Sequence, residues 1–273
     1  MKKLLSASLA AIALSTGAAQ AGTIVYGNNA TFGTEFITGI DVSTGQVIQQ
    51  FATPVQGNGR GIAVVGTTVY YSNADNGNIY KTDTITHTNN GVFVNTGFGG
   101  SGVATIAFDG TLFYATGYGS SNTTNVYDAN GNFVRTQNGL GAGRDGFEVA
   151  NNNIVANRGD GQGPYDRYDL NGSLLQSNFL VDPNTNTVTG VTFDGTNYYV
   201  SEINNNAIAT FNSSGTYVGR VTISTPELLL EDLSALGNVP GNPPPGTAVP
   251  EPMTLGLLGS ALVGLGIFRR RQA

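Results

Sequence analysis

Gly190-Val-Thr-Phe-Asp-Gly-Thr-Asn-Tyr-Tyr-Val200 has the pattern of a strand, a tight turn and a second strand rich in aromatic and β-branched residues. Its central Asp194-Gly195 pair is a strong hairpin signal, because glycine adopts the positive φ that such turns require. Related segments begin at Gly61, Thr105 and Gly146. Their spacing of about 42 residues indicates an internal repeat.

A second series of turns runs in step with the first. It consists of Asp41-Val-Ser-Thr-Gly, Asp128-Ala-Asn-Gly, Asp169-Leu-Asn-Gly and Asn212-Ser-Ser-Gly, with Asp83 as a degenerate member. Each turn follows a strand-like run and precedes an apolar one, so each repeat contains four strands. Four strands per ~42 residues is the period of a β-propeller blade. We therefore predict an all-β body, with a curled sandwich as the competing architecture.

The two ends of this body predict how the ring closes. Gly22-Thr-Ile-Val-Tyr matches the second strand of a repeat, whereas Asp232-Leu-Ser-Ala-Leu matches the inner strand. The last strand can therefore complete the blade that the first residues leave unfinished, which removes a free sheet edge. Inner strands near residues 61, 105, 146, 190 and 232 predict five four-stranded blades over residues 22–237. The repeats resemble those of NHL/YncE-type propellers.

Both ends of the chain carry features of export signals. Residues 1–21 combine two lysines, an apolar run and the small-residue pattern Ala19-Gln-Ala21, which predicts a signal peptide cleaved before Gly22. At the other end, a Pro- and Gly-rich linker over residues 238–249 leads to a separate segment, residues 250–273. An apolar run over residues 253–268 has the composition of a single, short transmembrane helix.

This final segment resembles the PEP-CTERM sorting signal of Gram-negative bacteria. Three parts carry the resemblance in order: Pro250-Glu251-Pro252, the apolar run, and Arg269-Arg270-Arg271. The resemblance implies an exosortase as processing partner and an inner-membrane-tethered intermediate. It also implies later release to the cell surface or extracellular matrix, and an association with exopolysaccharide, biofilm or floc formation.

Composition narrows the range of partners. Without the two terminal signals, seven basic and 17 acidic residues remain, so the net charge of the body is about −10 and nucleic acid is excluded as a partner. The chain contains no cysteine, which excludes disulfide staples and a thiol nucleophile. Its only histidine, His87, lies in a polar stretch and is predicted to be a solvated loop residue.

We find no catalytic motif, and expect neither catalytic residues nor a dedicated metal site. Charged residues at the starts of inner strands could instead gather at the mouth of the central channel, where they would bind a sugar or Ca²⁺ through oxygen ligands. Structural closure of the ring would explain Asp232 equally well. Tyrosines are a second candidate surface, because aromatic rings stack on sugar faces. The predicted channel-mouth residues are Arg60, Arg144, Asp145, Glu148, Glu231 and Asp232, and the predicted stacking residues are Tyr118 and Tyr165.

Three functions remain open. The leading hypothesis is a non-enzymatic, exported propeller that an exosortase sorts to the cell surface or matrix. A second is a propeller hydrolase or lactonase, resembling metal-dependent gluconolactonase-like enzymes, with a divalent ion in the central channel. A third is a propeller that binds a small ligand without catalysis.

Overall fold

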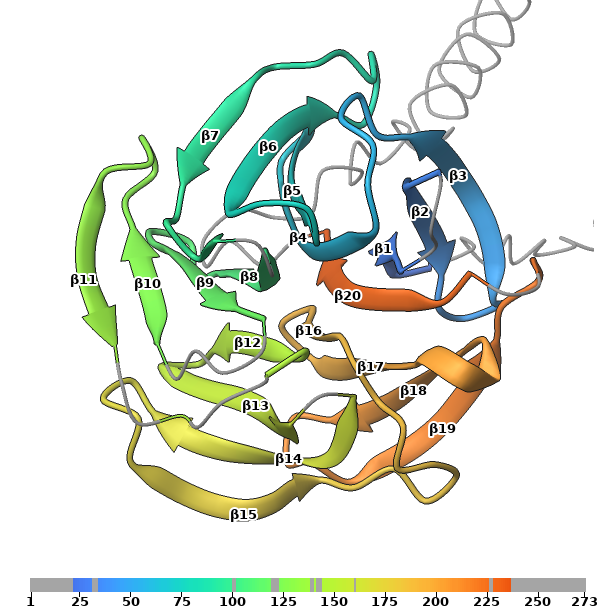
Figure 1. The fold of residues 1–273 in the computed structure, drawn as a ribbon. Coiled ribbons are helices and arrows are strands. Elements are labelled where there is room, and N and C mark those ends of the chain that lie inside the picture. Colours follow the sequence, from blue (N-terminus) through green and yellow to red (C-terminus); the bar gives the residue numbers. More distant parts are fainter. Residues whose placement is uncertain are drawn as a thin grey trace, which may run out of the picture.

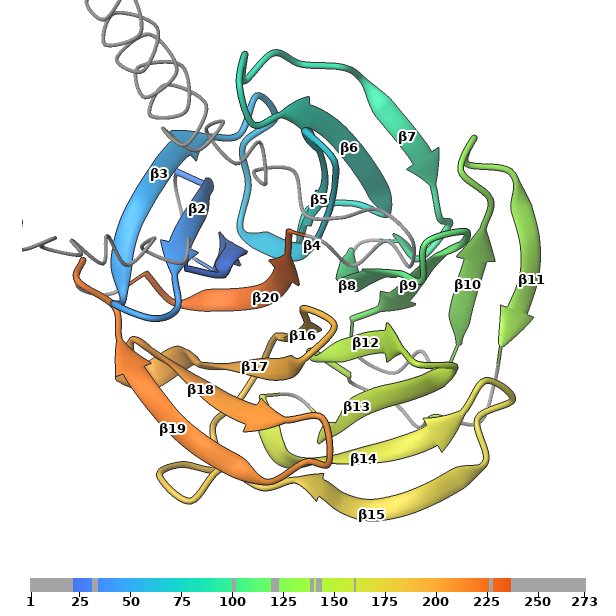
Figure 2. The same cartoon turned by 180° about the vertical axis from the view of Figure 1, so that it is seen from behind.

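The computed structural model describes residues 22–30, 34–99, 102–118, 123–137, 140, 144–159, 161–225 and 228–236. In these residues, twenty strands form five four-stranded antiparallel sheets. The sheets stand as blades around a central axis, and colour follows the ring in sequence order (Figure 1). The view from behind shows the same closed ring (Figure 2). The prediction of a five-bladed propeller is confirmed, and the sandwich alternative is excluded.

Each blade runs from an inner strand at the axis to an outer strand at the rim. Blade 1 contains β20 (Leu230–Ala235), β1 (Ile24–Asn29), β2 (Phe36–Asp41) and β3 (Gln46–Ala52). Blade 2 contains β4 (Gly59–Val65), β5 (Thr68–Asn73), β6 (Asn78–Asp83) and β7 (Val92–Asn95). Blade 3 contains β8 (Val103–Phe108), β9 (Phe113–Gly117), β10 (Thr124–Tyr127) and β11 (Phe133–Gln137).

The last two blades follow the same order. Blade 4 contains β12 (Phe147–Ala150), β13 (Asn153–Gly159), β14 (Gln162–Asp169) and β15 (Leu174–Leu180). Blade 5 contains β16 (Val191–Phe193), β17 (Asn197–Glu202), β18 (Ala207–Asn212) and β19 (Tyr217–Thr222). A short 3-10 turn, η2 (Ile203–Asn205), follows β17.

Blade 1 closes the ring with strands from both ends of the described chain. β20 pairs antiparallel with β1, from Val25 opposite Ala235 to Asn29 opposite Leu230, with one irregularity near Asn29. The predicted closure is therefore confirmed, and β1 has no free inner edge.

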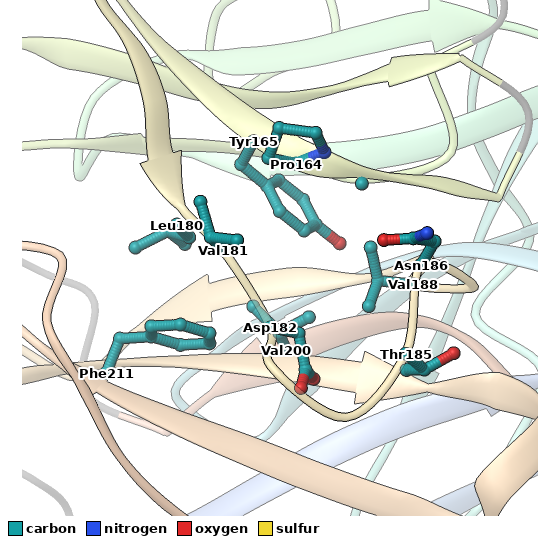
Figure 3. A pocket seen from close by; sticks show the side chains of 11 residues that line it. Pro164, Tyr165, Leu180, Val181, Asp182, Thr185, Asn186, Val188, Val200 and Phe211 are labelled. Carbon is teal, nitrogen blue, oxygen red and sulfur yellow. The ribbon is translucent and has the colours of Figure 1, made fainter.

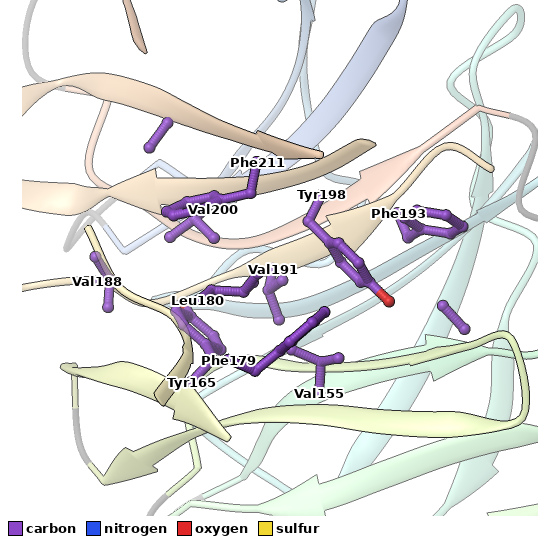
Figure 4. Packing of buried hydrophobic residues seen from close by; sticks show 12 residues of the cluster. Val155, Tyr165, Phe179, Leu180, Val188, Val191, Phe193, Tyr198, Val200 and Phe211 are labelled. Atoms are coloured by element: carbon purple, nitrogen blue, oxygen red, sulfur yellow. The ribbon is translucent and has the colours of Figure 1, made fainter. Parts of the chain in front are cut away.

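Five apolar clusters hold the blades together, one at each interface between neighbours. The interface between blades 4 and 5 contains Phe179, Tyr198 and Phe211 (Figure 4). Because both faces of every sheet are covered, adjacent aromatic residues on a strand pack against opposite neighbours: Tyr198 faces blade 4, and Tyr199 faces blade 1. Burial of these aromatic and aliphatic side chains is a major source of the free energy that stabilises the propeller.

The inner strands approach each other so closely that glycine is required on them. A Cβ atom on Gly190 would lie 2.5 Å from the Cα of Asp232 on β20. One on Gly61 would lie 2.7 Å from the side chain of Ile106 on β8. A ring of only five blades leaves little room at its axis, which explains why small residues occupy these repeat positions.

The two series of predicted turns lie at one end of the ring, which we call the turn end. Asp109 and Asp194 cap the turns between first and second strands, and their carboxylates accept hydrogen bonds from backbone N–H groups two and three residues later. Between third and fourth strands, the carboxylates of Asp128 and Asp169 accept hydrogen bonds from backbone N–H groups two and four residues later. Gly131 and Gly172 complete those turns at positive φ.

The predicted signal peptide, linker and sorting segment lie outside the described residues, as do Ala19, Ala21, Pro250–Pro252 and Arg269–Arg271. Within the part of the chain that is described, no helix has the length and apolar character needed to cross a bilayer.

Candidate functional site at the loop end of the ring

The opposite end of the ring, which we call the loop end, carries the connections between blades and between second and third strands. The inner strands begin here, so the topology brings most of the predicted channel-mouth residues to this end. Gly22 lies at the turn end instead, two residues before β1 and beside Asp41. Among the residues that the structure describes, the carboxylates of the loop end are Glu35, Asp75, Asp145, Asp182, Glu202 and Glu231.

Three predicted residues from three blades meet near the axis. Arg60 of β4 donates from Nη1 to Oε1 of Glu231 on β20 over 2.8 Å. The guanidinium carbon of Arg60 also lies 4.7 Å from the centre of the Tyr118 ring, which follows β9. The ion pair is largely buried, with side chains 13% and 6% exposed. This pairing holds Arg60 in place and presents the partly exposed Tyr118 beside a cation.

Asp232 lies at the centre of the ring and is fully buried. Its Oδ2 accepts hydrogen bonds from Ile62 N at 2.9 Å, Thr105 Oγ1 at 2.9 Å and Ile106 N at 3.2 Å. Its Oδ1 accepts one from Leu233 N at 2.9 Å. Burial raises the pKa of Asp232, while the four donors favour its charged form. One carboxylate thus connects the inner strands of blades 1, 2 and 3.

Side chains of other inner strands connect the remaining blades in the same way. Glu148 of β12 accepts a hydrogen bond from Phe193 N of β16 at 3.2 Å. Thr192 of β16 accepts one from Ala235 N of β20 at 2.9 Å, and Ser234 of β20 accepts one from Val64 N of β4 at 2.8 Å. Glu148 and Asp232, both expected at the channel mouth, therefore serve as cross-braces between blades.

Arg144 and Asp145 lie in the connection before β12 and do not join the Arg60 cluster. Arg144 is buried between blades 3 and 4, where its Nη2 donates to the Tyr168 hydroxyl over 3.1 Å. Burial lowers the pKa of Arg144, although neighbouring Tyr168 and Asp166 oppose the shift. Asp145 is 3% exposed. Arg144 and Asp145 are therefore buried and do not line an open channel mouth.

The expectation for Tyr165 needs correction. Its side chain is 1% exposed, and its hydroxyl donates to the carbonyl of Thr189 over 2.5 Å. The ring packs in the cluster between blades 4 and 5 and presents no face to a sugar. The reason is that blade 5 covers the face of blade 4 on which Tyr165 lies.

The carboxylates expected to hold Ca²⁺ do not fit that role. Glu231 is paired with Arg60, and Asp232 is saturated by four donors. In the part of the chain that the structure describes, no three His, Cys, Asp or Glu side chains gather into a metal-binding group. His87 lies exposed in its loop, as predicted, and stacks on Phe51 with ring centres 4.0 Å apart.

Sequence reasoning missed Glu35, a carboxyl group of the loop end whose pKa is strongly raised. Glu35 is fully buried, and Oε1 accepts a hydrogen bond from Asn28 Nδ2 at 3.0 Å. Burial raises the pKa of Glu35 to about 8, against the opposing hydrogen bond from Asn28. Gln56 accepts a hydrogen bond from Glu35 N. The one available signal was its position between two strands of blade 1, which does not reveal burial.

No protein-family model matches the chain, and no curated protein matches it in sequence. Solved structures match the fold. A chain of a nidogen/laminin complex aligns with a TM-score of 0.51 and 12% identity, covering 78% of this chain and 98% of that one. Glutaminyl cyclase of Myxococcus xanthus aligns with a TM-score of 0.50 and 15% identity, covering 61% of this chain and 71% of that one. Such identities show a shared propeller fold alone.

Proposed function

We propose that this protein is an exported, non-enzymatic β-propeller that an exosortase-type enzyme sorts to the cell surface or extracellular matrix, where it associates with exopolysaccharide. The terminal signals in the sequence motivate this proposal. One structural observation carries it further: the ring is closed entirely by residues between 22 and 236, through the pairing of β1 with β20. Removal of both signals would therefore leave the propeller intact.

The geometry near the axis favours a structural or binding role over channel chemistry. Inner-strand carboxylates serve as cross-braces between blades, and small residues occupy the positions where the strands converge. The metal-dependent lactonase alternative requires carboxylates that are available to a cation, and Glu231 and Asp232 are already engaged. We therefore place this alternative second.

Binding of a small ligand without catalysis has one observation in its favour, the cluster of Arg60, Glu231 and Tyr118 from three blades. A cation beside an aromatic ring suits an anionic sugar. Calorimetric unfolding with and without acidic oligosaccharides would show stabilisation in the wild type and none in Tyr118→Ala. Equal stabilisation of both would remove Tyr118 from the site.

The sorting proposal is tested by intact mass and fractionation of the native protein from its own host. We expect a chain that begins at Gly22, ends near Pro250 and is found outside the inner membrane. Glu251→Ala should leave the tail attached and the protein in the membrane fraction. An unchanged mature mass and location in this variant would refute the sorting proposal while leaving the fold untouched.

A further inference from the structure

Two carboxyl groups face each other at the loop end between blades 4 and 5. Glu202 ends β17 and is fully buried, whereas Asp182 lies in the connection from β15 to β16 and is partly buried. Asp182 borders the same cavity as Val200 of β17, the strand that Glu202 ends. Besides burial, the charge of Asp182 and its side-chain contact raise the pKa of Glu202. Two negative charges in a buried contact would repel strongly, so this arrangement needs a positive partner.

The hydrogen bonds to the two carboxyl groups show which of their oxygen atoms lack a donor. Oε2 of Glu202 accepts from Asn205 Nδ2 at 2.9 Å and lies 3.2 Å from Nη2 of Arg220. Oδ1 of Asp182 accepts from the backbone N and the side chain of Asn184 at 2.8 and 2.9 Å. The other two oxygens, Oε1 of Glu202 and Oδ2 of Asp182, are buried and receive no hydrogen bond from any residue that the structure describes. One proton between them would satisfy both.

The net charge around the two carboxyl groups favours a shared proton over a divalent metal ion. The ionisable groups that face the pair among the described residues are Arg220 on β19 and Tyr165 on β14. Two carboxylates and one arginine carry a net charge of −1, which a single proton neutralises and a divalent cation would overshoot. Burial raises the pKa of Glu202, and Asp182 raises it further. The hydrogen bond from Asn205 and the charge of Arg220 oppose this shift.

The segment that carries Asp182 is hydrogen-bonded to blade 4 on the C-terminal side of its tip. Gly163 N donates to Asn186 O at 2.9 Å, and Val188 N donates to Gly161 O at 3.2 Å. The tip, residues 182–185, reaches blade 5 through Asp182 and through Asn184, which donates to the Tyr217 hydroxyl over 3.0 Å. Figure 3 shows this tip bordering a cavity of about 20 Å³, enough for one water molecule, beside Tyr165 and Phe211.

We propose that Asp182 and Glu202 share one proton and that this proton fastens the tip of the connection between blades 4 and 5 to blade 5. Deprotonation leaves two facing carboxylates, and their repulsion detaches the tip and exposes the apolar cavity beneath it. The contact is complete at acidic pH and is lost as the pH rises from the ordinary glutamate range through the raised pKa of Glu202. Such a device would let an exported protein respond to the acidity of its surroundings.

Hydrogen exchange of a peptide spanning residues 181–189, followed against pH and corrected for intrinsic exchange, tests this proposal. In the full chain we expect protection to fall about tenfold as the pH rises through the transition, the change that about 1.4 kcal/mol would produce. Glu202→Gln, whose amide can donate to Asp182, should stay protected at all pH values. Asp182→Ala should be poorly protected throughout. Asp75→Asn, an exposed carboxylate in the corresponding part of blade 2, should retain the wild-type profile.

Two outcomes would overturn the proposal. One is a flat protection profile in the wild type. The other is protection at high pH that returns on addition of CaCl₂ alone, which would identify a cation site. A fluorophore on Asn186→Cys gives an independent readout in an otherwise wild-type background, since the natural chain has no cysteine. Its emission should change over the same pH range as the exchange.

Discussion

Carboxylates at the two ends of the ring experience opposite environments. At the turn end, the partly exposed Asp128 and Asp169 accept hydrogen bonds from their own turns, and these bonds lower the pKa of both groups. At the loop end, Glu35 and Glu202 are fully buried, and loss of hydration raises the pKa of both. The pKa values of the turn carboxylates are therefore set by residues within four positions along the chain. Those of the loop end are governed by distant strands.

This contrast predicts that the two ends of the ring lose stability in opposite directions of pH. Carboxylates of the turn end stabilise the fold while ionised, so their contribution is lost as the pH falls below the ordinary aspartate pKa of 3.8. Glu35 and Glu202 of the loop end are best tolerated while neutral, so stability is lost as the pH rises above 4.5. The experiments below separate the two ends, beginning with the largest expected effect.

Asp232→Ala should cause the largest loss. The substitution leaves three buried N–H groups, those of Ile62, Ile106 and Leu233, without their acceptor. At about 1–3 kcal/mol for each group, we expect the free energy of unfolding to fall by roughly 3–9 kcal/mol in urea titrations. Asp232→Asn keeps one oxygen acceptor and should lose about half as much. A loss below about 1 kcal/mol in the alanine variant would show that the central carboxylate does not join the blades.

Glu35→Gln should remove much of the alkaline loss of stability. Wild-type Glu35 must lose a proton in a buried site as the pH rises through about 8, whereas glutamine stays neutral. We expect the variant to be about 2–4 kcal/mol more stable than the wild type at pH values above that pKa, and nearly equal at acidic pH. Asp169→Asn is the matched control and should leave the alkaline limb unchanged. Parallel curves for Glu35→Gln and the wild type would contradict the assignment.

Gly190→Ala tests the close approach of inner strands. Its new Cβ would lie 2.5 Å from the backbone of Asp232, so β16 and β20 must separate. We expect a loss of about 1–3 kcal/mol by thermal or urea unfolding. Gly219→Ala on β19 introduces a methyl group with no atom nearby and should be close to neutral. Equal effects in the two variants would place the tight packing elsewhere.

Asp128→Ala should have the smallest effect and act only at the turn end. It removes the acceptor for Asn130 N and Asn132 N in an exposed turn. We expect a small fall in melting temperature at neutral pH that disappears under acid conditions, where the wild-type carboxylate is also neutral. Calorimetry at both pH values measures the difference. A difference that grows on acidification would have the wrong sign for this explanation.

Repeat spacing made much of the fold predictable from the sequence. The Asp-Gly and Asx turns are local, so Asp109 and Asp128 indicated where strands reverse. Gly22–Tyr26 and Asp232–Leu236 each matched one strand of a repeat, which was enough to predict ring closure. Nothing in the described structure bears on the sorting motif, which stays a prediction.

The candidate site was less predictable, because it depends on which blade lies beside each residue. Arg60 and Glu231 were named separately, yet only ring closure places them 2.8 Å apart. Tyr165 is removed from solvent by the neighbouring blade. Glu35 and Glu202 stood out in no local pattern, since burial by distant strands, rather than adjacent residues, perturbs them. The strand register alone could not reveal these environments.

The pairing of β20 with β1 also determines how the molecule would carry mechanical load. Any pull on the chain beyond Leu236 is transmitted along β20, which lies at the axis rather than the rim. The hydrogen bonds between antiparallel strands run perpendicular to that pull, so they are strained together in shear instead of opening one after another. The hydrogen bonds that Asp232 accepts from Ile62 N and Ile106 N also connect β20 to β4 and β8. If the propeller were held by its tail, tension would therefore act on β20, which is fastened both by its pairing with β1 and by the hydrogen bonds of Asp232.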